Sequence, residues 1–293
     1  MTKIIDYSKT LPQYLLPHHL LSRAVGGLAR CRIPAVKNLL IDGFRRLYDV
    51  DLSLAVETDP HGYPDFNSFF TRALRPDARP LASANGAVVS PVDGRVSQAG
   101  AIHDDSLLQA KGKEFSLAQL LGSPQRANVF QGGDYATIYL SPRDYHRIHM
   151  PLAGKLTGMV HIPGRLFSVS PATTRVVPGL FARNERVVCL FETDAGPMAM
   201  VLVGAIFVAS IETVWAGVVT PPAGKEISVR DFRNDAHALE LEQGAEMGRF
   251  NMGSTVILLF GRDQVEWGQA CRLDATVRMG QQLGVCRSKL PAN

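Results

Sequence analysis

Three short polar stretches interrupt the apolar, strand-like runs of this sequence and contain residue types that catalyse reactions. They are "SPVDGRV" around Asp93, "SPRDYHRIHMP" with His146 and His149, and "RFNMGSTVILLF", in which Gly253 and Ser254 precede an apolar run. A hydroxyl, an imidazole and a carboxylate together make an activated nucleophile, because the imidazole removes the proton of the attacking oxygen. The sequence therefore offers the parts of a Ser/His/Asp arrangement.

Two of these stretches also have a simpler interpretation. Asp93 and Gly94 form a dipeptide that is typical of a tight turn between two strands. His146 and His149 have a spacing that metal ligands can use, but no third ligand is evident, so a surface loop with solvated histidines is the simpler explanation. The four cysteines are widely separated and predict reduced thiols, and we assign no metal to the chain. They are Cys31, Cys189, Cys271 and Cys286.

The third stretch suggests a reaction of the backbone itself. An α/β-hydrolase would place its serine in a G-x-S-x-G turn, but Met252 and Val256 occupy the two glycine positions here. Gly253 has no Cβ, so its backbone can adopt strained conformations and expose its carbonyl to the hydroxyl of Ser254. The bond between Gly253 and Ser254 is thus a candidate for the reactive group.

The remaining pattern predicts an α+β fold. From about Gly86 onwards, short apolar runs alternate with Gly, Pro and Asp, which indicates a mostly antiparallel β domain with tight turns. The preceding part has helical periodicity. We therefore expect N-terminal amphipathic helices in residues 1–62 and a β-rich catalytic domain of the barrel-sandwich type in residues 63–293.

The first 50 residues are basic, whereas the rest of the chain is nearly neutral. They hold eight Lys or Arg and three Asp, a net charge of +5, against +4 for the whole chain. A basic leader on a neutral body suggests an anionic partner. The charged residues are Lys3, Lys9, Arg23, Arg30, Arg32, Lys37, Arg45 and Arg46, with Asp6, Asp42 and Asp49.

Apolar residues recur at three- and four-residue steps from Ile33 to Val50, which predicts an amphipathic helix. This helix either packs on the body with its charges in water or lies on anionic lipid with its apolar face down. A short helix capped by Asp65 or Asn67 should follow. The longest apolar run, 198–211, has 14 residues. It is shorter than the roughly 18–20 residues of a membrane span, so we expect a buried strand there.

The three polar stretches occur with "FNSFFTRALRPDARP", "PGLFARNERV", "ASIETVWAG" and "GAEMGRFNMGSTV" in an order that resembles the bacterial phosphatidylserine decarboxylases of the pyruvoyl-dependent type. The resemblance extends over nearly the whole chain. Family members most often have Leu at the position of Met252, and the exchange keeps an apolar side chain. The resemblance implies a self-processing lyase, made as a zymogen.

In such a protein, His149 would act as the general base that activates Ser254, with Asp93 orienting the imidazole. The hydroxyl of Ser254 would attack the carbonyl of Gly253, and the resulting ester would undergo elimination. The chain would end at Gly253, and position 254 would become a covalent pyruvoyl group, the cofactor. His146 would transfer a proton during decarboxylation.

The resemblance also implies the substrate and the partners. The pyruvoyl group would form a Schiff base with phosphatidylserine and release phosphatidylethanolamine, as the last step of phosphatidylethanolamine biosynthesis. A two-tailed anionic lipid does not readily leave the bilayer, which favours the interfacial interpretation of the basic leader. We expect a peripheral protein on the cytoplasmic face of the cell membrane, without nucleic-acid binding. Cleavage should give a β chain, 1–253, and an α chain, 254–293. Two such α/β pairs should then associate into a homodimer.

Two other functions are compatible with the residues alone. One is a Ser/His/Asp hydrolase of a lipid or ester, whose chain would stay uncleaved. The other is a barrel-sandwich carrier or binding module, which would have no need to break the bond before Ser254.

Overall fold

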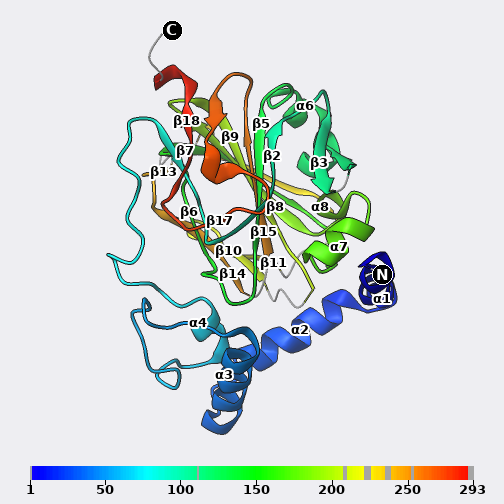
Figure 1. Ribbon diagram of the computed structural model, residues 1–293, viewed down its shortest axis with the longest axis vertical. Coiled ribbons are helices and arrows are strands. Elements are labelled where there is room, and N and C mark those ends of the chain that lie inside the picture. Colours follow the sequence, from blue (N-terminus) through cyan, green and yellow to red (C-terminus); the bar gives the residue numbers. More distant parts are fainter. Residues whose placement is uncertain are drawn as a thin grey trace.

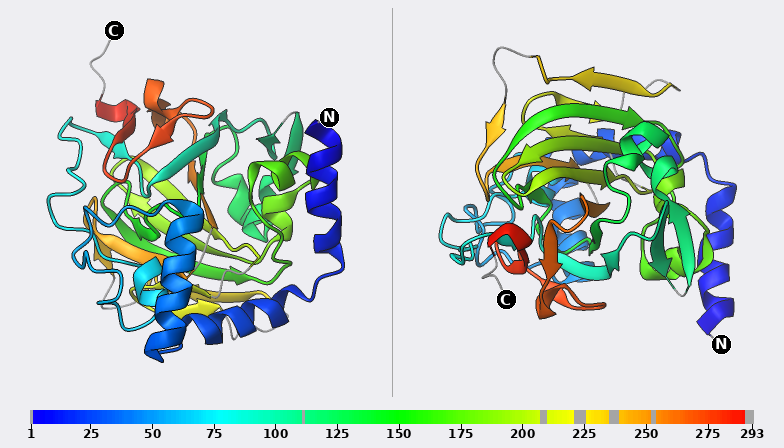
Figure 2. Two further views of the ribbon diagram at one scale, coloured as in Figure 1. Left: turned by 60° about the horizontal axis from the view of Figure 1, so that its bottom comes forward. Right: turned by 90° about the horizontal axis from the view of Figure 1, so that it is seen from above.

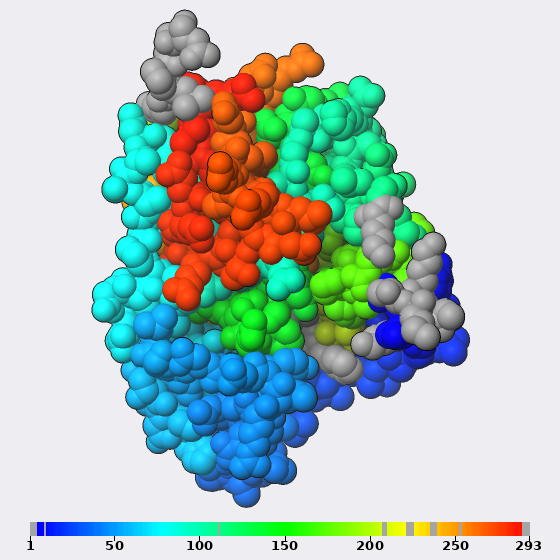
Figure 3. All heavy atoms as spheres, in the orientation of Figure 1, coloured from blue at the N-terminus to red at the C-terminus, as the bar shows by residue number. Residues whose placement is uncertain are grey.

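The computed structural model describes residues 2–110, 112–206, 210–220, 226–234, 239–251 and 254–289 (Figure 1). Helices α2 to α4 lie below the β domain in Figure 1 and form the base of the face shown in Figure 3, whereas α1 lies at the right-hand edge beside α7 (Pro171–Val176). These N-terminal helices are α1 (Thr2–Thr10), α2 (His18–Ala29), α3 (Pro34–Tyr48) and α4 (Phe66–Phe70), with a 3-10 turn at Leu11–Tyr14.

The predicted amphipathic helix is confirmed as α3. Pro34 stands in its first turn, where a missing N–H costs nothing and the fixed φ suits a helix. Asp49 ends the helix in the left-handed conformation, with φ of 52°. The short helix α4 begins after Asp65, whose carboxylate accepts a hydrogen bond of 2.8 Å from the backbone N of Ser68. Of the two residues predicted to cap this helix, Asp65 is therefore the one that does so.

The β domain consists of antiparallel sheets, and in the described part of the chain none of them closes into a barrel. The largest follows the order β12 (Ser228–Asp231), β7 (Gly154–Ile162), β8 (Arg186–Thr193), β9 (Gly196–Val203), β15 (Ser254–Phe260), β5 (Asp134–Leu140), β2 (Gly94–Ala101) and β17 (Thr276–Val277), with β13 (Glu240–Leu241) beside β7. A second sheet has the order β11 (Gly217–Thr220), β10 (Ser210–Thr213), β14 (Glu246–Asn251) and β6 (Arg147–His149).

Smaller elements complete the domain. β1 (Ala87–Val89), β18 (Gln282–Cys286) and β16 (Val265–Trp267) form one sheet, and β3 (Ser106–Ala110) pairs with β4 (Lys113–Ser116). The helices here are α5 (Leu117–Leu121), α6 (Pro124–Asn128), α7 (Pro171–Val176) and α8 (Leu180–Arg183), with 3-10 turns at Gln269–Cys271 and Arg287–Lys289. Figure 2 shows the large sheet curving around the interior, and the predicted α+β class is confirmed.

Strand β15 is buried on both faces, which explains why its sequence is apolar without alternation. Val256 and Leu258 face a core shared with Phe250 of the second sheet. Ile257 and Leu259 face a separate core that includes residues of α5 and α8. Full burial of each such side chain stabilises the fold by about 1.5–3 kcal/mol, so this strand is firmly anchored.

The long apolar run 198–211 is divided between two strands. Met198–Val203 belongs to β9 and is fully buried, as predicted, whereas Ser210 begins β10 in the other sheet. Residues 207–209 lie outside the described ranges. None of the helices in the described ranges has the length and apolar character needed to span a bilayer.

Candidate active site

The predicted cleavage point lies where the chain passes from one sheet to the other. β14 ends at Asn251 in the second sheet and β15 begins at Ser254 in the large sheet, while Met252 and Gly253 lie outside the described residues. The strands that pair with β14 and β15 also follow one another across the two sheets. β5 ends at Leu140, directly opposite Ser254, and β6 pairs with β14.

The segment 141–146 therefore joins the two strands that pair with the strands on either side of the cleavage point. This register brings the predicted histidine stretch to the junction that leads into Ser254. The backbone N of Phe250 donates to the carbonyl of His146 at 3.0 Å and extends the pairing. The topology thus assembles two of the three polar stretches, although they are about a hundred residues apart in the sequence.

The side chain of Ser254 is fully buried and faces the core between the two sheets. By strand alternation it shares the face of Val256 and Leu258, which belong to that core. Its Oγ has no hydrogen-bond partner among the described residues, and the neighbouring Thr255 Oγ1 is in the same condition. Burying a hydroxyl without a hydrogen-bond partner lowers the stability of the fold. A functional role would explain why these two hydroxyls are kept.

His146 is fully buried directly before β6. Its Nδ1 lies 2.8 Å from the carbonyl oxygen of Asp144, and because a carbonyl only accepts, Nδ1 carries the proton. Its Nε2 finds no partner within the described chain. Burial lowers the pKa of His146 to about 3, and the charge of Arg72 acts in the same direction. The ring is therefore neutral near pH 7, with a free lone pair on Nε2.

His149 has both ring nitrogens engaged. Nδ1 donates to the carbonyl oxygen of Gly244 at 2.7 Å, and Nε2 lies 2.9 Å from the hydroxyl of Tyr145, which donates to it. Burial lowers the pKa of His149 and raises that of Tyr145, so both groups are neutral near pH 7. His149 is thus a neutral base whose basic nitrogen is covered by a phenol.

Asp93 lies in a bend between β1 and β2, directly before Gly94 begins β2. These two strands belong to different sheets, so the D-G dipeptide does not form the tight turn that was predicted. The Asp93 carboxylate accepts hydrogen bonds from Arg79, one of 2.9 Å from Nε and one from Nη2, and from the backbone N of Met279 at 2.8 Å. None of its hydrogen bonds within the described residues reaches His149. The expected direct contact is therefore absent from this structure, and Asp93 influences His149 only through its charge, which raises the pKa of the imidazole against the larger effect of burial.

A cavity of about 310 Å³ lies beside these groups, and its lining includes Asp93, Arg79, Arg72 and Tyr145. Tyr145 contributes to the lining of this cavity and also bonds to His149. It therefore lies between the imidazole and the cavity that the Asp93–Arg79 ion pair lines. The resemblance had predicted Asp93, and not Tyr145, beside the imidazole.

Comparison with known proteins decides the family. The protein-family model described as "Phosphatidylserine decarboxylase" matches residues 66–285 of this chain, and a second family model, described as "PSD", matches residues 8–49. A protein of Bordetella pertussis is 58% identical over 277 residues, which is 93% of this chain and 92% of its own length. A protein of Azotobacter vinelandii is 57% identical over 276 residues, 94% of this chain and 96% of its own. Both are named phosphatidylserine decarboxylase proenzyme.

The chain belongs to the phosphatidylserine decarboxylase family. A further relative of the same name, from Ectopseudomonas mendocina, is 57% identical over 275 residues, 94% of this chain and 96% of its own. The resemblance seen in the sequence motifs is confirmed, and so is the enzyme class, a lyase that acts as a decarboxylase.

Three groups at the candidate site were not assigned a role from the sequence. They are Tyr145 and the carbonyl of Gly244 beside His149, and Arg79 beside Asp93. Tyr145 lies inside a stretch already singled out, so its position next to the histidines was a usable signal. The ion pair between Arg79 and Asp93 joins two different segments, 14 residues apart, and no local pattern reveals it.

The leader helices contact this site through α4. Asn67 Nδ2 donates to Asn251 Oδ1 at 3.0 Å, at the last described residue before the cleavage point. The ring of Phe70 lies 4.1 Å from that of His146, and Phe44 of α3 packs edge-on against Phe70 at 5.8 Å. The leader and the candidate active site are thus in contact through a chain of aromatic rings.

Proposed function

We propose that this protein decarboxylates phosphatidylserine to phosphatidylethanolamine with a pyruvoyl group that it makes from Ser254 by breaking the bond to Gly253, as the last step of phosphatidylethanolamine biosynthesis. The observation that carries the proposal is the hydroxyl of Ser254, which is buried without a partner at the passage between the sheets. The proenzyme names of the relatives support a precursor that requires processing.

In the self-cleavage, Ser254 Oγ forms a bond to the carbonyl carbon of Gly253 and gives its proton to His149. The amide C–N bond breaks, the serine nitrogen takes up the proton, and an ester replaces the amide. Removal of the α-proton of residue 254 then expels the carboxylate of Gly253. Tyr145 now covers the basic Nε2 of His149, so this phenol either passes the proton on or turns aside.

The remaining enamine at position 254 takes up one water and releases one ammonia, which leaves a ketone next to the carbonyl of residue 254. The surroundings fit such a group. It would lie at the start of a fully buried strand, where the two sheets exclude bulk water and favour loss of a charged carboxylate.

The pyruvoyl group supplies an electrophilic carbonyl that condenses with the substrate amine and accepts the electrons left by CO2. The protein supplies the proton transfers. With its Nδ1 proton held by the Asp144 carbonyl, His146 presents a basic Nε2. This nitrogen takes a proton from the substrate ammonium and later returns it to the carbon that lost CO2.

The mass of the denatured protein tests this proposal. We expect two chains, the smaller being residues 254–293 and lighter by one ammonia than the same peptide with an N-terminal serine. Phosphatidylserine labelled in its serine carboxyl should lose the label as CO2, with one phosphatidylethanolamine formed for each. A single intact chain with full activity would refute the pyruvoyl mechanism, and release of fatty acid would point to a hydrolase.

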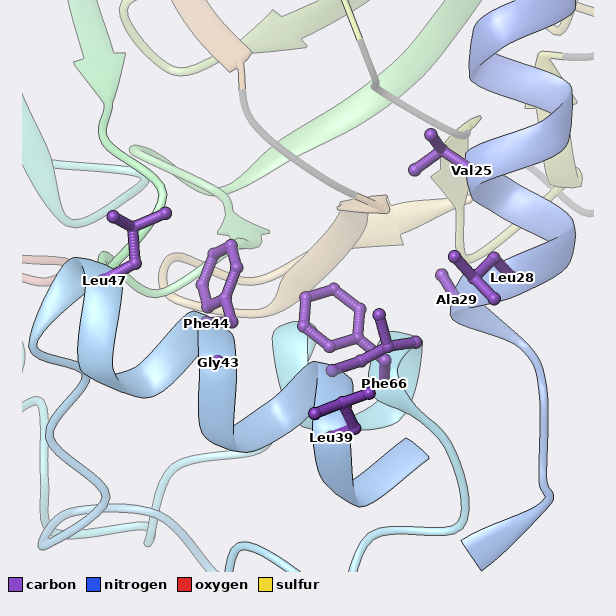
Figure 4. Close-up of a pocket in the computed structure, with 9 residues that line it drawn as sticks. Val25, Leu28, Ala29, Leu39, Gly43, Phe44, Leu47 and Phe66 are labelled. Carbon is purple, nitrogen blue, oxygen red and sulfur yellow. The ribbon is translucent and has the colours of Figure 1, made fainter. Parts of the chain in front are cut away.

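The leader supports the proposal of a peripheral membrane protein. An apolar pocket of about 320 Å³ lies between α2, α3 and α4 (Figure 4). Phe44 and Phe66 lie side by side in it, and Leu39 and Leu47 of α3 are 74% and 73% exposed. Exposed leucines around an apolar pocket, on a basic segment, suit an anionic lipid surface. We place the protein on the cytoplasmic face of the cell membrane, with acyl chains over this pocket.

Substitution of Leu39 or Leu47 by Glu should weaken sedimentation with vesicles that contain phosphatidylserine. Burial of one leucine contributes about 1.5–3 kcal/mol, so each substitution should reduce the partition constant roughly tenfold or more. Point substitutions are preferable to deletion of the leader, because Asp6 pairs with Arg175 of the β domain. The control is Leu273→Glu, a leucine of the β domain that is 59% exposed. Equal binding of all three variants would exclude this surface.

A further inference from the structure

Arg72 follows α4 and is one of the most buried charged residues, with 5% of its surface exposed. Its Nη2 donates to the backbone carbonyls of Arg143 at 2.9 Å and Asp144 at 3.5 Å. Its Nε has no hydrogen-bond partner among the described residues. The charges of Asp93, Asp144 and Asp51 favour its charged form, but none of these carboxylates forms an ion pair with it in the described structure. A buried guanidinium that bonds only to carbonyls is costly to keep, since desolvation opposes its charge.

The two carbonyls belong to the segment that presents His146. The carbonyl of Asp144 accepts from the guanidinium and also from Nδ1 of His146. The carboxylate of Asp144 turns the other way and accepts from the backbone N of Ser141 at 2.7 Å. The segment is therefore closed on one side by its own turn and held on the other side by Arg72.

Two further contacts join the same parts of the chain. The ring of Phe70 packs on the ring of His146, and Arg147 Nε donates to the carbonyl of Thr71 at 2.9 Å. Three successive residues, 70–72, thus hold the backbone and the ring around His146. Phe70 and Thr71 add no charge here, and Arg72 is the charged side chain whose field acts on the imidazole.

We propose that Arg72 is a positioning residue for His146, which fixes the Asp144 carbonyl and thereby keeps the imidazole in the tautomer with a bare, buried Nε2. A polarised, immobile carbonyl holds the proton on Nδ1, and a nearby positive charge disfavours the imidazolium. The inference rests on the proposed function, because it assigns Arg72 to the proton transfers of His146.

Arg72 also contributes to the lining of the 310 Å³ cavity, so a competing role is direct binding of an anionic group of the substrate. The two roles differ in kinetics. Loss of a binding contact raises KM, whereas loss of the correct imidazole geometry lowers kcat, because the proton transfer occurs only after binding.

The experiment compares Arg72→Met and Arg72→Lys with Arg126→Met in the full chain. Arg126 is a matched control, since its guanidinium also donates to two backbone carbonyls, those of Leu121 and Gly122, at 2.9 and 3.2 Å, and it takes no part in the site. kcat and KM are measured with dispersed phosphatidylserine. The imidazole nitrogens are observed by 15N NMR in histidine-labelled Ser254→Ala chains, which need no maturation, and His146 is assigned by the signals that His146→Gln removes.

In the unsubstituted background we expect a protonated Nδ1 and an unprotonated Nε2 for His146. Arg72→Met should mix the two tautomers, raise the pKa of His146 and lower kcat on the order of 100-fold, with KM changed less than about threefold. Arg72→Lys should recover part of kcat, because it retains the charge, and Arg126→Met should change neither quantity.

Unchanged His146 signals in folded Arg72→Met, an effect confined to KM, or an equal effect of Arg126→Met would each overturn the inference. The NMR readout does not depend on activity. If the wild-type chain released no CO2 from phosphatidylserine, the proposed function would fail, while the tautomer of His146 would still report on Arg72.

Discussion

Ser254→Ala is expected to leave the chain as one intact polypeptide without decarboxylase activity. The substitution removes the only atom that can attack the carbonyl of Gly253 from this side chain, and it removes the precursor of the carbonyl cofactor. Both stages of the proposed mechanism therefore stop at the same residue. We expect no detectable release of CO2 from labelled phosphatidylserine, and a single band of full length after denaturation.

The structure shows why a loss of activity in Ser254→Ala would reflect the missing hydroxyl and not a failure to fold. Ser254 Oγ makes no hydrogen bond within the described residues, so its removal breaks no stabilising contact. Loss of an unsatisfied buried hydroxyl is close to neutral or stabilising for the fold. Circular dichroism and thermal unfolding should therefore show a folded protein.

Thr255→Val is the matched control. Thr255 is equally buried in the same strand, and its Oγ1 is equally without a partner in the described structure. Valine has nearly the same shape, so this variant should still be cleaved. If Thr255→Val also stayed intact, the buried hydroxyls would act together, and if Ser254→Ala were cleaved, residue 254 could not supply the nucleophile.

The sequence predicted the components of this site better than their connections. The resemblance of the motifs selected Ser254 and the two histidines, because the residue types alone left solvated loop histidines as the simpler explanation and only marked the bond before Ser254 as a candidate. The partner of Asp93 could not be inferred in this way. Arg79 reaches Asp93 from the segment after α4, and the phenol of Tyr145 fills the position next to His149.

The same distinction applies to the fold. Periodicity predicted α3, because an amphipathic helix encodes its buried face locally. The D-G dipeptide was a poorer guide, since Gly94 begins β2 and the strand before it belongs to another sheet. The run 198–211 gave no sign that it divides between two sheets, since both halves are apolar. That division matters for the site, because β10, which contains the last two residues of the run, pairs with β14 and so positions the chain that leads to the predicted cleavage point.

The two histidines should separate the two stages of the reaction. His149→Gln should prevent or greatly slow self-cleavage, by roughly 100-fold to 10,000-fold, the usual contribution of a general base. His146→Gln should still be cleaved, at least in part, but should decarboxylate poorly by a similar factor. The measurement is the fraction of cleaved chain over time, followed by CO2 release normalised to the cleaved fraction.

Glutamine is a polar side chain of similar length that cannot act as a base. Each variant therefore loses the basic Nε2 together with the Nδ1 contact to a carbonyl, that of Gly244 for His149 and of Asp144 for His146. The surroundings of Nε2 differ, since a phenol covers it in His149, whereas it is bare in His146 and its ring precedes the strand that pairs beside the cleavage point.

That difference makes the reverse outcome meaningful. If His146→Gln blocked cleavage and His149→Gln allowed it, the bare Nε2 of His146 would be the base for Ser254. His149 and Tyr145 would then serve the decarboxylation, with the phenol as the proton carrier between the imidazole and the cavity. The Arg72 variants would report on the same question, because a residue that fixes the tautomer of His146 must affect whichever stage uses its Nε2.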